Sequence, residues 1–410
     1  MSRILNFSFK VWVLAAGRLL SGIGTGFTLF YAPIFFVNSV GLSSTLVGVA
    51  LGSGSVSGVV GRFLGGQGVD SPLWGRRKIL LASAAISVLA DVVLSLTSNF
   101  PTLVLGNLLM GFGVGMYWPA TEAAIVDLTT PPQRNEAFAI TRLADSLGLS
   151  LGVVLGGALI ANSGNYRTLF IIDGISFAIF FAIIYFAIAE TYQFKPQSVT
   201  TQDNGWLLAF RDRALMVFVA VNILFTVYLS QVQTTMPLYL KNFVPLGSAT
   251  GFSEQTISSL FTWHIVFAAV CQLPIAWFLN RFSRITGLSF SLLMWGVAFI
   301  LVWMTGTTGD NALYLAIAAL GVMSLGMVTY TPVASGLVAD LAPESLRGVY
   351  LSINSQCWAI GYFIGPPLGG WALDNPYTNY FWLACAGSIV FGLVILQYLK
   401  RLIKVRKITT

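Results

Sequence analysis

Four ionisable residues stand inside long apolar stretches of this 410-residue chain: Arg18, Glu122, Arg142 and Asp145. On insertion scales, such a side chain at mid-membrane costs about 2.5–3.5 kcal/mol, so each of the four calls for a partner or a task. A rise of about 1.5 Å per residue puts all four about 8–12 Å inside their helices, measured from the ends that share one side of the membrane. Two cations and two carboxylates at one depth would neutralise each other.

Proton binding is the chemistry open to this layer. We hypothesise that Glu122 or Asp145 takes up a coupling proton, which would loosen its pairing with the arginines and open a cytoplasmic gate. A permanent salt-bridge lock explains the same four residues equally well.

Neutral hydrogen-bonding and aromatic side chains form a second group of candidates, which we expect to line a mostly apolar substrate cavity. His264 is the only histidine and could bind substrate or relay protons, but a hydrogen-bonded packing role is an equal alternative. We expect Asp91 to have a local role. Asp173 lies near the start of a helix, where the helix dipole favours an acidic side chain. The candidate cavity residues are Asn222, Gln231, Gln233, His264, Tyr330, Asn354, Gln356 and Trp358.

Enzymatic chemistry finds little support in the sequence. A membrane-embedded enzyme would need a nucleophile with a base, or a metal cluster. The chain has one histidine, no helix-borne metal-ligand spacing, and three cysteines that all fall inside apolar stretches, Cys271, Cys357 and Cys385. We therefore expect no enzyme activity, no cofactor, no metal and no redox role.

Long membrane-spanning helices must position these residues. The chain is 56% hydrophobic and 9% charged, whereas about a quarter of the residues in soluble domains are charged. Twelve apolar stretches of about 20–27 residues are each long enough to cross a hydrocarbon core of about 30 Å. The sequence thus predicts an all-α membrane protein with twelve transmembrane helices that start near Val11, Leu46, Lys78, Thr102, Ala137, Thr168, Ala214, Gln255, Ile285, Ala312, Tyr350 and Asn379.

The distribution of Lys and Arg predicts the orientation. An even number of spans puts both termini on one side, and only Arg167 and Lys241 among the loop cations fall on the other. Because cytoplasmic loops are enriched in Lys and Arg, we expect both termini to be cytoplasmic, in the inner (plasma) membrane. The net charge of +7 then reflects topology and contact with anionic lipid, without nucleic-acid binding. The cations on the terminal side are Arg3, Lys10, Arg62, Arg76, Arg77, Lys78, Arg134, Lys195, Arg211, Arg213, Arg281, Arg284, Arg347, Lys400, Arg401, Lys404, Arg406 and Lys407.

An internal repeat divides the chain into residues 1–190 and 214–410, joined by a polar cytoplasmic linker at 191–213. At an offset of 213 residues, Tyr117, Pro119, Asp127, Arg134, Gly148, Gly152, Gly156 and Gly157 match Tyr330, Pro332, Asp340, Arg347, Gly361, Gly365, Gly369 and Gly370; at an offset of 204, Pro33 matches Pro237. Two parallel copies of six helices place a binding site between them near the midplane. The repeat partners of the four ionisable residues are uncharged, namely Asn222, Ser335, Ser355 and Trp358, so titration is predicted to be concentrated in the first half.

The loop GGQGVDSPLWGRRK resembles a signature of the major facilitator superfamily, and the resemblance covers nearly the whole chain. It implies a conformational latch at Gly66, Asp70, Gly75, Arg76 and Arg77, with Asp127, Arg134, Asp340 and Arg347. Four residues separate Asp70 from Gly75 where the family usually has two. In the second copy Ala276, Asn280, Arg281 and Arg284 replace the motif, so only the first copy is expected to latch by charge.

Glycines recur on the fifth and eleventh spans, at Gly148, Gly152, Gly156 and Gly157 and at Gly361, Gly365, Gly369 and Gly370. They are similar to the glycine-rich motif of twelve-helix drug/proton antiporters, although such glycines also serve close packing of membrane helices in general. Val153 and Asn107 depart from the antiporter pattern.

The resemblance implies proton-coupled export of amphipathic or lipophilic small molecules by a monomer in the lipid bilayer, through rocking of the two halves. Uptake or exchange of a specific metabolite, or of an organic anion held by Arg18 and Arg142, is the alternative within transport. A non-transporting membrane sensor is the alternative outside it.

Overall fold

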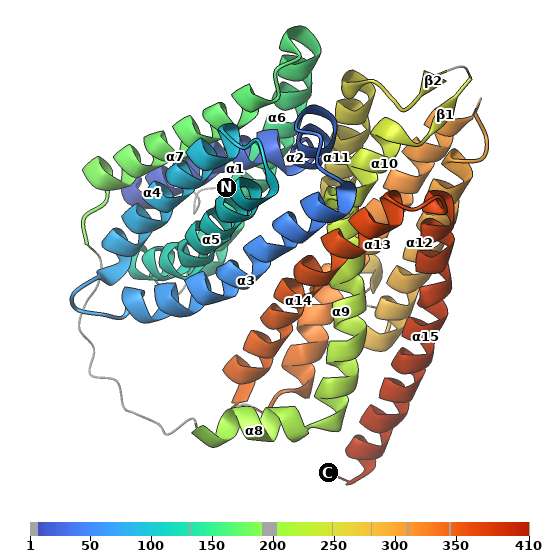
Figure 1. Cartoon of the computed structure of the whole chain (residues 1–410). Coiled ribbons are helices and arrows are strands. Elements are labelled where there is room, and N and C mark those ends of the chain that lie inside the picture. Colours follow the sequence, from blue (N-terminus) through green and yellow to red (C-terminus); the bar gives the residue numbers. More distant parts are fainter. Residues whose placement is uncertain are drawn as a thin grey trace. The chain divides into compact units, whose positions relative to one another are not determined.

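The computed structural model describes residues 7–130, 133–190, 203–247, 249–279, 281–309, 311–343 and 346–409, and it is almost entirely helical (Figure 1). The chain divides into two compact units, Met1–Gln197 and Ser198–Thr410. The division falls inside the predicted linker, of which residues 191–202 lie outside the described part.

Unit 1 consists of six long helices and a short extension of the first. Its elements are α1 (Phe9–Leu29), α2 (Ala32–Ile34), the π-helical η2 (Phe35–Ser39), α3 (Ser44–Val69), α4 (Gly75–Ser95), α5 (Phe100–Leu128), α6 (Arg134–Ser163) and α7 (Arg167–Ala187). Helix α1 packs on α6 and α7, α4 packs on α5 and α7, and α3 packs on α5.

Unit 2 repeats this plan and adds a short helix before it and a two-stranded hairpin within it. Its elements are α8 (Asp203–Arg211), α9 (Arg213–Gln233), α10 (Thr235–Asn242), β1 (Pro245–Leu246), β2 (Ala249–Thr250), α11 (Glu254–Leu279), α12 (Arg284–Thr305), α13 (Ala312–Leu341), α14 (Arg347–Leu373) and α15 (Thr378–Thr409). Helix α9 packs on α14 and α15, α12 packs on α13 and α15, and α11 packs on α13. These pairs are the repeat counterparts of those in unit 1.

The predicted set of twelve helices is confirmed. Each of the twelve long helices in the described part begins within three residues of its expected start. Eleven spans are long and apolar enough to cross a membrane. Helix α14 is also long enough, but its polar residues around Asn354 and its two internal prolines and several glycines lower its mean hydropathy.

The matched prolines explain a shared break in the first helix of each unit. Proline lacks an N–H donor and its ring clashes with the carbonyl four residues before it. Helix α1 ends at Leu29 and the chain resumes in α2, which contains Pro33. In unit 2, α9 ends at Gln233 and the chain resumes in α10, which contains Pro237.

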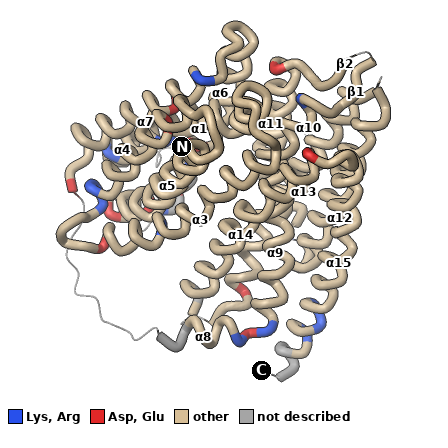
Figure 2. The backbone as a smooth tube through the Cα atoms, in the orientation of Figure 1, with Lys and Arg blue, Asp and Glu red and all other residues tan. Residues whose placement is uncertain are grey.

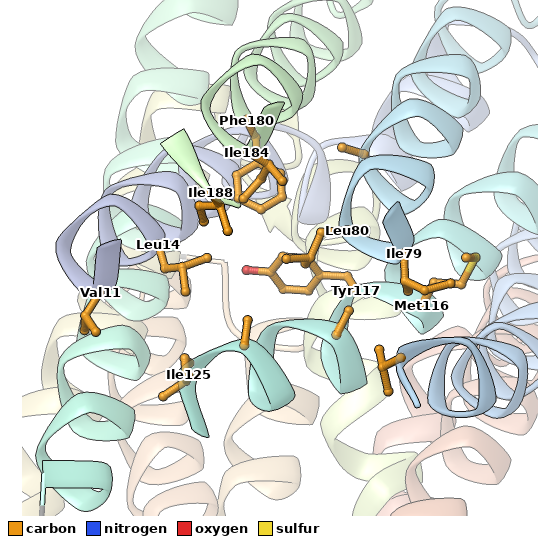
Figure 3. Close-up of a cluster of buried hydrophobic side chains, with 14 of the residues drawn as sticks. Val11, Leu14, Ile79, Leu80, Met116, Tyr117, Ile125, Phe180, Ile184 and Ile188 are labelled. Carbon is orange, nitrogen blue, oxygen red and sulfur yellow. The ribbon is translucent and has the colours of Figure 1, made fainter. Parts of the chain in front are cut away.

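An apolar core in unit 1 joins α1, α4, α5 and α7. Figure 3 shows Tyr117 of α5 among Leu14 of α1, Leu80 of α4 and Ile184 of α7, all of which are buried. The Tyr117 ring packs edge-on against Phe180 at a centroid distance of 5.8 Å. This core fixes the rotation of α1 and α5, and with it the direction of the charged groups they carry.

Charged residues in both units lie mainly near the ends of the helices, and the middle portions of the tubes are largely uncharged (Figure 2). In unit 2 the basic residues gather near α8 and at the C-terminal end of α15. In a bilayer this arrangement leaves only a few ionisable groups at depth, and those few must be held by protein.

Candidate functional site

Arg18 of α1 and Asp145 of α6 form a buried bidentate ion pair. The Arg18 Nε donates to Asp145 Oδ1 at 2.9 Å, and Nη2 of Arg18 donates to Oδ2. The Arg18 side chain is 2% exposed, whereas that of Asp145 is 29% exposed. A planar guanidinium matches a carboxylate in this fork geometry, which gives the pair both strength and a fixed orientation.

Aromatic rings complete the surroundings of the arginine. The guanidinium carbon of Arg18 lies 5.2 Å from the centroid of the Trp118 ring and 5.9 Å from that of Tyr117. Both distances are within the range of a cation–π contact. The charge of Arg18 is thus compensated by one carboxylate that remains partly accessible.

Glycines bring α1 and α6 close enough for this pair. A Cβ built at Gly152 would lie 2.8 Å from the Gly26 Cα, and one built at Gly148 would lie 3.0 Å from the Gly22 Cα. Backbones therefore meet directly across this interface, as small residues permit in membranes. Gly156 instead faces the rings of Phe27 and Tyr31, and Gly157 is buried.

Glu122 and Arg142 are not part of this pair. Both side chains are exposed, and within the described part of the chain neither forms an ion pair. The four predicted residues therefore do not form one network of direct ion pairs among the described residues. Glu122 interacts electrostatically with Arg18 and Arg62, and Arg142 with Asp145, but at longer range.

Neutral hydrogen bonds occupy the corresponding place in unit 2. Asn222 of α9, the repeat partner of Arg18, is fully buried and donates from Nδ2 to Asn354 Oδ1 at 2.9 Å. The Tyr330 hydroxyl donates to Asn222 Oδ1 at 2.5 Å. Tyr330 stacks on Phe225 at 4.5 Å between ring centroids and lies 6.4 Å from Trp358. Three predicted cavity residues thus form one polar cluster against aromatic rings.

Other predicted cavity residues have packing partners within unit 2. Gln231 is buried and donates from Nε2 to the Gly365 carbonyl at 2.8 Å, which joins α9 to α14. His264 is 5% exposed, with Nδ1 at 2.8 Å from Ser324 Oγ and 3.1 Å from the Leu320 carbonyl, so it joins α11 to α13. These contacts favour a hydrogen-bonded packing role for His264 over substrate binding or proton relay.

Gln233, Gln356 and Trp358 are half-buried. The Trp358 ring stacks on Tyr362 at 6.1 Å between centroids. These residues extend the aromatic cluster along α14.

The predicted latch residues of unit 1 meet at the start of α4. The Arg76 Nε lies 2.9 Å from Asp127 Oδ2, and Arg76 Nη2 lies 3.5 Å from Asp70 Oδ1. The two additional loop residues therefore do not keep Asp70 away from the arginine. Gly75 has a φ of +70°, a conformation that favours glycine. Gly66 has open space where a Cβ would be.

Glu190 also contacts the start of α4, which the sequence did not reveal. Its carboxylate accepts from the backbone N–H of Arg76 at 2.9 Å and of Arg77 at 3.2 Å, and so caps α4. An anion is favoured at a helix N-terminus, where backbone N–H groups lack partners. Arg77 donates to the Tyr185 carbonyl at 2.6 Å and lies over its ring. The cluster of basic residues at the start of α4 was the sequence feature that could have indicated a carboxylate partner there.

Unit 2 also has a charge contact at this place, so the expectation that only the first copy pairs by charge is wrong. The Arg284 Nε lies 3.3 Å from Asp340 Oδ2, and the two side chains are 46% and 59% exposed. Arg284 at the first position of α12 replaces the missing motif arginine in space. Arg134 begins α6 and is half-buried. Arg347 begins α14, and its side chain lies outside the described part.

The second set of glycines receives side chains rather than a backbone. A side chain of a facing helix fills the space that a Cβ would take at three of these glycines: Thr226 at Gly361, Ser230 at Gly365 and Thr235 at Gly369. The Thr226 hydroxyl donates to the Cys357 carbonyl at 2.8 Å. Gly370 is buried.

Each unit contains an apolar cavity. The first, of about 480 Å³, is lined by residues of α3, α4 and α5 and by the loop between α3 and α4, including Gln67, Trp74 and Phe112. The second, of about 530 Å³, lies between α11 and α13 beside Trp263 and Ile317. Among the described residues, no group of three or more His, Cys, Asp and Glu is placed to hold a metal ion.

Comparison with known proteins identifies the family. The model of the Major Facilitator Superfamily matches twice, over residues 14–244 and 242–408. The chain belongs to this superfamily. It is therefore a multi-pass membrane protein and a secondary transporter, not an enzyme.

Its relatives include named antiporters and resistance proteins. A Na(+), Li(+), K(+)/H(+) antiporter of Planococcus maritimus is 24% identical over 402 residues, which cover 90% of this chain and 91% of that one. The quinolone resistance protein NorA of Staphylococcus aureus is 22% identical over 94% of this chain and 96% of its own.

Solved structures show the same fold. The nucleoside transporter NupG superposes with a TM-score of 0.79 at 15% identity, covering 96% of this chain and 99% of its own. A D-xylose-proton symporter superposes with a TM-score of 0.72 at 18% identity, covering 95% and 96%. At these identities the likeness describes the architecture.

Proposed function

We propose that this superfamily member is a proton-coupled exporter of amphipathic or lipophilic small molecules, with Asp145 as the coupling carboxyl and Arg18 as its counter-ion. The observation that carries the proposal is the Arg18–Asp145 pair, in which a fully buried cation depends on a partly accessible carboxylate. The names of the antiporter and resistance-protein relatives support the direction and the coupling. We further propose a monomer in the inner (plasma) membrane, with both termini and the 191–213 linker cytoplasmic.

Protonation of Asp145 is the proposed coupling step. A proton delivered to an Asp145 carboxylate oxygen removes the charge that compensates Arg18. A buried cation without a partner is costly, so the arginine must move or find another anion. Glu122, which already interacts with Arg18 at longer range, is the nearest alternative in unit 1. The smooth glycine interface between α1 and α6 permits the two helices to shift against each other.

Alternating access of the two units would convert this step into transport. The contacts at the start of α4, where Arg76 meets Asp127 and Glu190 caps the helix, would hold one conformation until the charge state changes. A membrane potential of about 100 mV supplies roughly 2.3 kcal/mol per charge moved. This corresponds to about a fifty-fold concentration ratio per net charge.

The substrate class follows from the aromatic cluster of unit 2. Trp358 and Tyr362 are half-buried and offer ring faces beside a small number of amide and hydroxyl groups. Phe225 and Tyr330 of the same cluster are buried. Ligand sites of this kind favour apolar bodies with one or two polar groups. Lipophilic dyes and planar amphipathic drugs are therefore the compounds to screen first.

The test is transport by the purified chain in proteoliposomes with an imposed proton gradient. The double variant R18Q/D145N removes the titratable group without leaving a lone buried charge. We expect it to retain counterflow of a transported compound, which needs no proton, and to lose proton-driven accumulation. D374N is the matched control, because Asp374 is an exposed carboxylate at the end of α14 in unit 2, and it is expected to keep both activities. Proton-driven accumulation by R18Q/D145N at the parent rate would refute the proposed role of Asp145 and favour the permanent lock.

A second candidate, uptake or exchange of an organic anion, is favoured by one observation. Arg142 is an exposed cation three residues from Asp145, with no ion pair among the described residues. Counterflow with labelled organic anions distinguishes the candidates. Anion exchange that is abolished in R142Q, with no export of lipophilic cations, would establish the second candidate in place of the first.

A further inference from the structure

A second pair of acidic side chains lies buried between α4 and α7. Asp91 of α4 and Asp173 of α7 are each 1% exposed, and the two groups interact electrostatically. The α7 backbone packs closely against Asp91. A Cβ built at Gly174 would lie 3.2 Å from the Asp91 Cβ and 3.9 Å from its Oδ2. Both carboxyl groups therefore share one apolar interface.

Hydrogen-bond donors are few at this interface. Asp173 Oδ2 accepts from Thr28 Oγ1 at 3.2 Å, and Asp173 Oδ1 accepts from Ser176 Oγ at 3.5 Å. Neither oxygen of Asp91 has a hydrogen-bond partner among the described residues. An ionised carboxylate that is buried without a donor or a cation carries the full penalty of lost solvation.

No described cation pairs with either carboxylate. Arg18 is held by Asp145, and Arg167 donates to the carbonyls of Ser95 and Thr97. The titratable group that faces Asp91 is Asp173. The other charged groups on the helices packed around the pair lie toward the opposite ends of those helices: Lys10 of α1, Arg62 of α3, Arg76, Arg77 and Lys78 of α4, and Glu122 and Asp127 of α5.

We propose that Asp91 and Asp173 form a second proton-binding site, separate from the Arg18–Asp145 pair. Two like charges at one buried place cannot both persist without a counter-ion, so at least one of the two carboxyl groups holds a proton taken from solvent. Along α1, Thr28 follows Arg18 by ten residues, which is about 15 Å of helix. The two sites are thus at different depths in one unit and are joined through α1.

The site also contacts the helix that carries the first pair. Gly24 of α1 faces Asp173 and Ser176 at a position where a Cβ would collide with both, and Thr28 of α1 donates to Asp173. A change in the protonation of the acid pair therefore alters the contact between α1 and α7. This assignment does not depend on the proposed export function, because proton binding is measured directly.

Infrared titration of the purified full-length protein tests the assignment. Protonated carboxyl groups give a C=O stretch that shifts in D₂O, and spectra are compared for the parent, D91N, D173N, the double variant D91N/D173N and the control D374N. Asp374 is an exposed carboxylate at the end of α14 in unit 2. At pH 7 we expect a protonated-carboxyl band in the parent, its loss in D91N/D173N and its retention in D374N. An unchanged band in D91N/D173N overturns the proposal.

The same titration separates a proton from a metal cation. Spectra are recorded in choline chloride and again in sodium chloride at constant pH. A band that is present in both media supports the proton site. A band that disappears on addition of sodium overturns it and assigns the pair to a monovalent cation.

Folding is checked by size exclusion and thermal unfolding. Because a neutral amide resembles a protonated carboxyl group in size, the asparagine variants are expected to fold. If the double variant does not fold, D91S/D173S, which also removes both carboxyl groups, carries the test, and an unchanged band at pH 7 in it overturns the proposal.

Discussion

The two units place different chemistry at the same position of one fold. In unit 1 the first helix carries Arg18, which is buried and held by a carboxylate of α6. In unit 2 the matching helix carries Asn222, which is equally buried and held by an amide and a tyrosine hydroxyl. Both arrangements satisfy a buried polar group, but only the first changes its charge balance when a proton arrives. The internal repeat places the two clusters at equivalent positions, and only the cluster of unit 1 contains a carboxyl group that can respond to pH.

The interfaces that carry these clusters differ in the same way. Between α1 and α6, Gly148 and Gly152 meet the α1 backbone directly, and the Arg18–Asp145 pair crosses the same interface. The α14 glycines instead face hydroxyl-bearing side chains, and Thr226 of α9 donates across to the Cys357 carbonyl. A charged pair thus crosses the unit 1 interface, and neutral hydrogen bonds cross that of unit 2.

Breaking the charged pair should have the largest effect. D145N leaves Arg18 buried without a counter-ion, and removing one partner of a buried pair costs about 3–5 kcal/mol. Because the Asp145 side chain is 29% exposed, we expect the lower end of that range. The apparent midpoint of thermal unfolding in detergent measures the loss, and R18Q/D145N should recover most of it. Equal midpoints for D145N and the parent would show that the pair contributes nothing.

Alanine at the interface glycines should have the next largest effect and should distinguish the two units. Overpacking costs about 1–3 kcal/mol in both G152A and G365A. In G365A the new Cβ meets Ser230 Oγ, so S230A should restore part of the stability. In G152A it meets the backbone at Gly26, so no truncation of a side chain can help. Thermal unfolding of G152A, G365A and G365A/S230A checks this. If truncation of a neighbouring side chain also rescued G152A, the two interfaces would not differ as proposed.

Loss of a neutral hydrogen bond should have a smaller effect and no consequence for coupling. Y330F removes the donor to Asn222 and should lower the free energy of unfolding by about 0.5–1.5 kcal/mol. Proton-driven accumulation in proteoliposomes should keep its pH dependence, because the cluster in unit 2 is uncharged. A shifted pH profile in Y330F would mean that unit 2 also takes part in proton coupling.

The exposed ion pair of unit 2 should matter least. R284A removes a contact between side chains that are 46% and 59% exposed, so we expect a change of about 0–1 kcal/mol. R76A in unit 1 removes a cation that is 14% exposed and contacts Asp70, Asp127 and the Val69 carbonyl, so its loss should be larger. Thermal unfolding compares the two, and a larger loss for R284A would reverse the ranking.

Much of the fold could be predicted from the sequence, because length and apolarity decide what crosses a membrane. The twelve helix starts follow from them. The repeat match of Pro33 with Pro237 was also visible, although the break in the first helix of each unit was not predicted from it. The repeat offset brought Arg18 and Asn222 into register, which made the comparison of the two clusters possible.

The site could be predicted only in part, because depth along a helix does not fix its rotation. Arg142 lies three residues from Asp145, which rotates it by about 60° around α6, and its side chain is exposed and outside the ion pair. The Arg284–Asp340 contact was missed because Asn280 replaces the motif aspartate and the carboxylate partner comes from another helix. Asp91 and Asp173 lie on helices far apart in sequence, and no periodic pattern announced that they would meet.

The cap formed by Glu190 has a mechanical consequence. It is the last described residue before the 191–202 connection, and its carboxylate is fastened to the first turn of α4. Tension on the tether that leaves unit 1 would therefore be delivered directly to the turn that presents Arg76 to Asp127. Cleavage of the 191–202 connection would remove any such pull on α4 and leave the helices of both units intact.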